Sequence, residues 1–133
     1  MEINLNCDLG EKSKHHSNEN DPELLKIVNS ANVACGYHAG DEQTMHEVVK
    51  ISKENHFSIG AHPSFKDPEN FGRKRMDLSA SEITKLVTDQ YEILQNIASL
   101  QGEKVSHIKP HGALNNMACE DLELATTLAK TIY

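Results

Sequence analysis

The sequence predicts an α/β fold built on a parallel sheet, and three observations lead to this prediction. Four short strand-like segments, INLNCDLG, SANVACGYHAGD, FSIGAHPSF and VSHIKPHGAL, alternate with helical segments. Each strand-like segment ends in a polar residue able to do chemistry, and strands alternating with helices are typical of a parallel sheet or barrel. The chain has 133 residues, of which 38% are hydrophobic, so we expect a single domain over residues 1–133.

The first two helices are expected behind recognisable start signals. The first begins at Asp21, interpreted as an N-cap before Pro22, and is short. The second covers residues 42–55 behind Asp41, with apolar residues at helical spacing. Both follow a strand-like segment, as a strand-helix repeat requires.

The last two helices complete the alternation. Ser79 and Glu82 have the spacing of a capping box, and Gly102 lies where the third helix would stop. A fourth helix is expected over residues 121–133. The order is therefore strand-helix, repeated four times, with no linker that would divide the chain.

The strand residues separate into two faces when counted by twos. The apolar face holds mainly Ile, Leu, Val, Ala and Cys, and in a barrel it would meet the helices. The other face is polar or small and would line the interior, with its ionisable groups at the mouth. Its members are Asn4, Asn6, Asp8, Asn32, Ala34, Gly36, His38, Ser58, Gly60, His62, His107, Lys109 and His111.

Composition and charge exclude several classes of function. The net charge of −7 argues against nucleic acid and anionic membranes as partners, because both attract clustered positive charge. No apolar run approaches the roughly 20 residues that span a bilayer, and the N-terminus lacks signal-peptide character, so a cytoplasmic location is expected. Three cysteines with no close pair predict reduced thiols, and Cys7 and Cys35 are expected in the core.

Five motifs in series, NCDLGE, SANVACGYHAGD, IGAHPSF, FGRKRM and KPHGALNN, resemble the LamB/YcsF family, the A subunit of bacterial 5-oxoprolinase. The resemblance implies a β/α barrel of the glycoside hydrolase/deacetylase type. It also implies ATP-dependent hydrolysis of 5-oxo-L-proline to L-glutamate, carried out with B and C subunits. ATP would bind without a GxxxxGK[ST] loop, which the sequence lacks.

The chain is about half as long as members of this family. We therefore expect only the first four or so strand-helix units of the barrel, with two open sheet edges that invite pairing with another chain. A second copy of this chain is one candidate, which would make a homo-oligomer.

Asp8, His38 and His62 have two chemical interpretations. One carboxylate and two imidazoles from three strand ends suit a divalent metal such as zinc. The same groups suit direct catalysis, with Asp8 as an electrostatic or general-base group and the histidines as proton carriers. The sequence leaves both open.

Lys109 and His111 complete the predicted catalytic set. A lysine on an inward face is costly to bury unpaired, so Lys109 should meet the carboxylate of Asp8 or of the substrate. Asn6, Arg73 and Lys109 are candidate substrate-binding residues, and Arg73 opens a run of three cations able to grip anions.

Three classes of function follow from these residues and the resemblance. The first is an amidohydrolase subunit of 5-oxoprolinase. The second is a metal-dependent carbohydrate deacetylase-like hydrolase. The third is a non-catalytic binding or assembly subunit.

Overall fold

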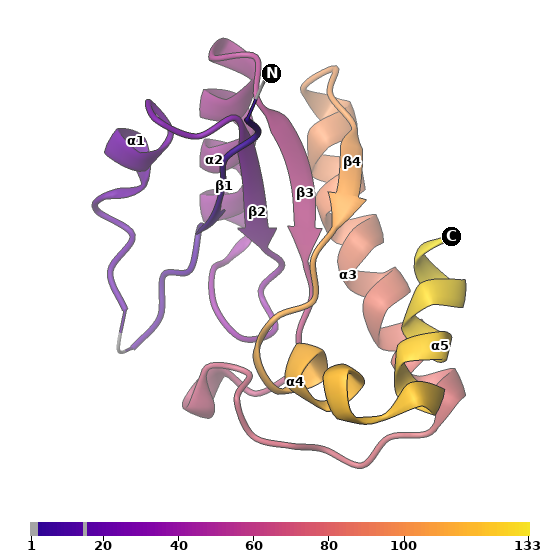
Figure 1. Cartoon of the computed structure of the whole chain (residues 1–133). Helices are drawn as coiled ribbons and strands as arrows, with labels where there is room; N and C mark the ends of the chain where they lie inside the picture. Colours follow the sequence, from indigo (N-terminus) through magenta and orange to yellow (C-terminus); the bar gives the residue numbers. More distant parts are fainter. Residues whose placement is uncertain (1–2, 15) are drawn as a thin grey trace.

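The computed structural model describes residues 3–14 and 16–133 and contains a four-stranded sheet with helices (Figure 1). The strands are β1 (Asn6–Leu9), β2 (Ser30–Ala34), β3 (Ser58–His62) and β4 (Val105–Ile108). The α-helices are α1 (Asp21–Leu24), α2 (Glu42–Glu54), α3 (Ala80–Leu100), α4 (Gly112–Glu120) and α5 (Leu122–Ile132), and a 3-10 turn covers Pro68–Asn70. The predicted α/β class is confirmed. No helix in the described part of the chain is long and apolar enough to cross a membrane.

The sheet is parallel, and each strand pairs with the next one along the chain, in the order β1-β2-β3-β4. Its register places Asp8 opposite Asn32, Asn32 opposite Gly60, and Gly60 opposite His107. This row carries polar or small side chains, as the count by twos predicts. The neighbouring row pairs Ala31 with Ile59 and is apolar.

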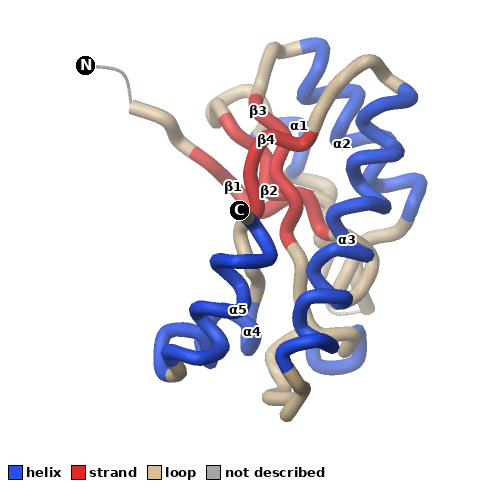
Figure 2. Tube along the Cα trace, turned by 90° about the vertical axis from the view of Figure 1, so that its right-hand side faces the viewer, coloured by secondary structure: helices blue, strands red, loops and turns tan. Residues whose placement is uncertain are grey.

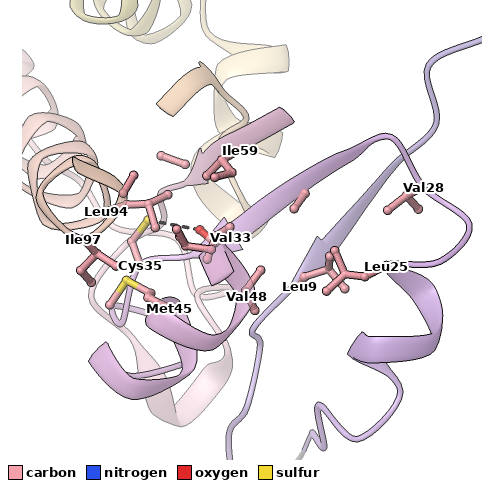
Figure 3. Close-up of a cluster of buried hydrophobic side chains, with 14 residues drawn as sticks. Leu9, Leu25, Val28, Val33, Cys35, Met45, Val48, Ile59, Leu94 and Ile97 are labelled. Atoms are coloured by element: carbon pink, nitrogen blue, oxygen red, sulfur yellow. Dashed lines mark hydrogen bonds between the residues drawn. The ribbon is translucent and has the colours of Figure 1, made fainter. Parts of the chain in front are cut away.

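The apolar face of the sheet packs against α2 and α3, which lie side by side on that face (Figure 2). Val33, Ile59 and Leu94 are buried in the core between these layers (Figure 3). A second apolar cluster joins α3, α4 and α5 below the carboxyl ends of the strands, around Phe65 and Leu114. The helices therefore cover one face of the sheet and leave the polar face for a site.

Two of the predicted helix starts agree with the structure. Asp41 accepts a hydrogen bond from the amide of Thr44, and Ser79 and Glu82 form a reciprocal capping box. The α3 helix ends at Leu100, and Gly102 follows with a left-handed φ of 76°. These local signals fix where α2 and α3 begin because each cap satisfies amides that the first helical turn leaves without partners.

The start of α1 differs from the prediction. Asn20 occupies the cap position, and Asp21 is the first helical residue. The Asp21 carboxylate instead accepts a hydrogen bond from the amide of Gly10 at 2.7 Å. This bond ties α1 to the turn that follows β1.

The helix α4 was not predicted, because its sequence was read as the end of the fourth strand. The strand ends at Ile108, although the amides of Lys109 and His111 still donate to the carbonyls of Ala61 and Pro63 beyond it. The chain then turns into α4 at Gly112, whose φ is 56°. The turn moves His111 off the strand and onto the rim of the sheet.

The edge of the sheet at β4 borders a hollow of about 440 Å³. Its walls come from α3, β4 and α5, including Tyr91, Val105 and Ile108. Within the described residues, neither β1 nor β4 has a second strand neighbour, which agrees with the expected open edges.

Candidate functional site

The five predicted catalytic residues lie together at the carboxyl ends of the strands. Asp8 Oδ2 is 3.4 Å from His62 Nε2, and the His111 Nδ1 atom is 3.0 Å from that same nitrogen. The rings of His38 and His111 stack with centroids 3.9 Å apart. The Lys109 ammonium contacts both oxygens of Asp8, at 2.6 and 2.8 Å. The predicted pairing of Lys109 with a carboxylate is confirmed.

Glu11 is a site residue that the sequence prediction missed. Its Oε1 atom lies 3.0 Å from His38 Nε2, 3.4 Å from His111 Nδ1 and 3.7 Å from His62 Nε2. Gly10, with a left-handed φ of 69°, turns the chain after β1 and brings Glu11 back over the strand ends. The sequence did hold one indication of this role, because Glu11 is the last residue of the NCDLGE motif.

Four side chains could hold a metal ion, and they differ from the predicted set of Asp8, His38 and His62. Glu11 and His111 join His38 and His62, with one donor atom from each all within 4.8 Å of one another. Asp8 lies beside this group, and both its oxygens contact the Lys109 ammonium. We call Glu11, His38, His62 and His111 the histidine cluster.

Asp8 is held ionised by its neighbours. Burial acts to raise its pKa, but hydrogen bonds and charge from His62, Lys109 and Asn32 outweigh burial and hold the pKa of this carboxyl well below its usual range. Asn32 donates to Asp8 Oδ1 at 2.9 Å and accepts from His107 Nε2 through its own oxygen, also at 2.9 Å. Asn32 therefore links His107 to Asp8 and fixes the orientation of the Asp8 carboxylate.

The three histidines of the cluster are buried, with side-chain exposures of 0% for His38, 1% for His62 and 8% for His111. Burial lowers the pKa of His38, although Glu11 opposes this. Burial and the neighbouring His38 lower the pKa of His111 to about 4. His38 and His111 are therefore neutral near pH 7, the state in which imidazole binds metals. Burial acts to raise the pKa of Glu11, but its hydrogen bond with His38 and the charge that the imidazoles carry when protonated lower it.

The Phe71–Gly72 segment packs against the cluster and was also missed, although it opens the FGRKRM motif. The Phe71 ring lies edge-on to His38 and His111, with centroid distances of 5.3 and 5.1 Å. The carbonyl of Phe71 accepts a hydrogen bond from His111 Nε2 at 2.9 Å. A β-carbon at Gly72 would lie 2.9 Å from that of His38, and φ there is 65°, so glycine is required.

A hollow of about 420 Å³ opens beside the cluster, and we call it the site hollow. Asp8, His62, Lys109 and His111 form one part of its wall, and Arg73 forms another. Its remaining lining residues are Pro110, Gly112, Asn115 and Asn116.

The side chains of Arg73, Lys74 and Arg75 have different surroundings. Arg73 lines the site hollow and packs on Phe71, whereas Arg75 pairs with Glu120 on the surface at 2.7 Å. The side chain of Lys74 is exposed.

Asn6 lies further from the carboxyl ends of the strands than Asp8, and it is exposed on the polar face. Its Oδ1 accepts from Asn32 at 2.8 Å, and it lines a separate hollow of about 330 Å³ on the polar face with His107 and Lys109. Asn6 therefore reaches the site hollow only through Asn32 and Asp8.

The predicted core thiols are confirmed. Burial raises the pKa of Cys35 to about 12, and its thiol contacts the carbonyl of Val33. Cys7 packs against the main core, and burial together with the Asp8 charge raises its pKa. Neither thiol has the low pKa that a nucleophile needs.

The geometry combines two chemical capacities. Three imidazoles and a carboxylate can bind a divalent cation or move protons. Arg73 and Lys109 can attract an anionic group into the site hollow. Together these features define an α/β protein of the β/α-barrel class, whose reacting groups stand at the carboxyl ends of parallel strands.

Comparison with known proteins identifies the family. The model of the LamB/YcsF family matches residues 3–133, and the chain belongs to that family. The A subunit of 5-oxoprolinase from Staphylococcus carnosus is 44% identical over 133 residues, and that from Staphylococcus aureus strain MSSA476 is 43% identical. Each match covers 100% of this chain and 53% of the relative. The chain spans about half the length of these relatives.

A solved structure shares the fold. The crystal structure of a lactam utilization protein from Thermus thermophilus superposes with a TM-score of 0.92 at 38% sequence identity. The match covers 98% of this chain and 53% of that protein. The fold is thus part of a β/α barrel, as the sequence predicts.

Proposed function

We propose that the chain acts in a 5-oxoprolinase that hydrolyses the lactam of 5-oxo-L-proline to L-glutamate, coupled to ATP hydrolysis and together with B and C subunits. The observation that carries the proposal is the site hollow, where Arg73 and Lys109 stand beside Asp8 and two histidines. The names of the two staphylococcal relatives and of the Thermus protein support a lactam as the substrate.

The reaction sets requirements that these residues can meet. Phosphorylation of the lactam oxygen by ATP makes the ring carbon electrophilic, and water then adds to that carbon. The C–N bond breaks and the nitrogen leaves as the amine of glutamate. A second water releases the phosphate. A preorganised cation near the oxygen stabilises the negative charge that develops during addition.

The residues take separate roles in this proposal. Arg73 binds the carboxylate of 5-oxoproline, and Lys109 stabilises charge on the reacting oxygen. The low pKa of Asp8 makes it a weak base, so its role is to orient the water and the ring N–H. His62 and His111 line the hollow where the water is activated, and His38 lies behind them, stacked on His111. Asn6 supports Asp8 through Asn32.

The test is an assay of the chain with its candidate B and C partners. With 5-oxoproline and ATP present, we expect glutamate and ADP to appear in equal amounts, and omission of ATP should stop both. Substitution Asp8→Ala or His62→Ala should abolish glutamate formation. Retained turnover in either variant would overturn the assignment.

A metal-dependent carbohydrate deacetylase is the second candidate, and the histidine cluster is the observation that favours it. Such an enzyme would release acetate from an N-acetylated sugar without ATP. The same assay, run with the sugar and without nucleotide, separates the two candidates. Binding of 5-oxoproline without turnover in the complete assembly would instead indicate a non-catalytic binding subunit.

A further inference from the structure

Two histidine nitrogens in the cluster face each other, and the far side of each ring is held by a backbone carbonyl. His62 Nδ1 contacts the backbone carbonyl of Lys109, and His111 Nε2 contacts the carbonyl of Phe71. A carbonyl oxygen only accepts, so each of these nitrogens donates a ring hydrogen to it. The other two nitrogens, Nε2 of His62 and Nδ1 of His111, lie 3.0 Å apart, and in the metal-binding form of imidazole both offer their lone pairs at this point.

Glu11 adds a third electron-rich atom at the same point. Its Oε1 lies 3.4 Å from His111 Nδ1 and 3.7 Å from His62 Nε2. Three lone-pair donors that converge in a buried place repel one another, and a cation among them removes that repulsion. From these contacts we propose that the histidine cluster binds one divalent metal ion of the zinc class, through Glu11 Oε1, His62 Nε2 and His111 Nδ1, with His38 as the fourth donor.

The spacing of the donors suits tetrahedral coordination. Bonds of about 2.1 Å at tetrahedral angles separate neighbouring ligand atoms by about 3.4 Å. The separations among Glu11, His62 and His111 are 3.0, 3.4 and 3.7 Å. His38 Nε2 lies 3.0 Å from Glu11 Oε1 and completes the group of four.

The surroundings of the cluster also favour an ion. The two carbonyls that hold His62 and His111 have the role of the outer hydrogen-bond partners that orient metal-binding imidazoles. His38 is fully buried, and within the described residues its Nδ1 atom has no hydrogen-bond partner. Lys109 and Asn32 engage Asp8, so Asp8 stands beside the ion as a partner for a bound water.

The donor types select the metal. Three imidazole nitrogens and one carboxylate suit Zn²⁺ and similar ions, whereas Mg²⁺ and Ca²⁺ prefer oxygen ligands. The inference concerns the cluster alone and does not depend on the substrate proposed above. When bound, such an ion supplies a Lewis acid and an acidic water at the wall of the site hollow.

The experiment is titration of the full chain, treated with chelator and dialysed, with Zn²⁺ in a calorimeter, alongside Co²⁺ absorption and metal analysis. We expect one Zn²⁺ per chain, a Co²⁺ spectrum typical of tetrahedral coordination, and no displacement by millimolar Mg²⁺. Glu11→Gln and His111→Gln should each weaken binding at least 100-fold. His46→Gln, at a half-buried position of α2 outside the cluster, is the matched control and should bind as the parent does.

Two results would overturn the proposal. One is the absence of stoichiometric Zn²⁺ binding to the unmodified chain, a result that needs no variant and is independent of folding defects. The other is binding that Glu11→Gln and His111→Gln leave unchanged while circular dichroism shows both variants folded. If the chelator-treated enzyme still hydrolyses the lactam, the proposed function stands and a bound ion has no part in the reaction.

Discussion

Asp8 and Lys109 form an ion pair that joins the two edge strands of the sheet. Asp8 belongs to β1 and Lys109 follows β4, yet the ammonium contacts both carboxylate oxygens at 2.6 and 2.8 Å. In a flat sheet, three strand spacings would separate these edges by about 14 Å. The contact therefore indicates a curved sheet, as in the wall of a barrel.

Removing this ion pair should affect turnover far more than stability. Because both side chains are partly exposed, Lys109→Met should lower the free energy of unfolding by about 1 kcal/mol or less. Under the proposed function, turnover of 5-oxoproline in the assembled enzyme should fall at least about 100-fold, because the variant lacks the charge assigned to stabilise the reacting oxygen. Lys85→Met, which breaks the exposed Lys85–Asp89 pair on α3, is the control and should leave turnover unchanged. Equal losses of turnover in both variants would contradict the role of Lys109.

Arg73 and Arg75 offer a matched pair of substitutions. Arg73 lines the site hollow, whereas Arg75 pairs with Glu120 outside it. If Arg73 binds the substrate carboxylate as proposed, Arg73→Met should reduce kcat/KM for 5-oxoproline by about 10- to 100-fold, mainly through KM. Arg75→Met should stay within about twofold of the parent. Steady-state kinetics decide the question, and an unchanged KM in Arg73→Met would remove Arg73 from the substrate site.

The buried histidines predict a loss of stability in acid. An imidazole in the unfolded chain has a pKa of about 6.5, whereas the pKa of His111 is lowered to about 4 in the folded chain and that of His38 is also lowered. Between these values the unfolded state binds more protons, so the free energy of unfolding should fall as the pH drops from about 6.5 towards 4. Urea titrations of the chelator-treated chain at several pH values measure this slope.

The source of this slope can be tested by substitution. His111→Gln should flatten it because one titrating group is gone, and His46→Gln should not. Asp8 also lowers the free energy of unfolding in acid, but only below about pH 4, because its pKa in the folded chain lies below the ordinary carboxyl value. A free energy of unfolding that stays constant between pH 7 and pH 5 would refute the prediction.

Gly60 leaves the space that His107 fills on the polar face. A β-carbon at residue 60 would overlap the imidazole of His107, whose nearest atom would lie 2.1 Å away. Gly60→Ala should therefore destabilise the fold by about 1–3 kcal/mol, as overpacking does. In a His107→Ala background the same change should cost much less, which a double-mutant cycle by chemical unfolding would show. Additive effects would mean that the two residues do not compete for this space.

Local patterns predicted most of the fold. Period-two alternation separated the two faces of the strands, and the caps at Asp41 and Ser79 fixed the starts of α2 and α3. The helix α4 was missed because only three residues separate the end of β4 at Ile108 from the start of α4 at Gly112, too few for periodicity to show the change.

The candidate site was predicted in part. The strand ends supplied Asp8, His38, His62, Lys109 and His111, because parallel strands end at one edge of a sheet. Glu11 was missed since it lies past Gly10, where a left-handed turn determines its direction. Phe71 reaches the cluster through a loop whose course depends on tertiary contacts, including the bond from the Ala113 amide to the Gly72 carbonyl.

The sequential strand order has a consequence for how the chain folds during translation. Each strand pairs with the one made just before it, so no later strand has to be inserted between two earlier ones. Pairing a strand with its nearest neighbour along the chain closes a shorter loop than pairing it with a more distant strand, and so costs less chain entropy. The sheet can therefore grow in the order in which the ribosome releases it. His111 is the last donor of the histidine cluster to emerge, so capture of an ion by all four donors would follow the docking of β4.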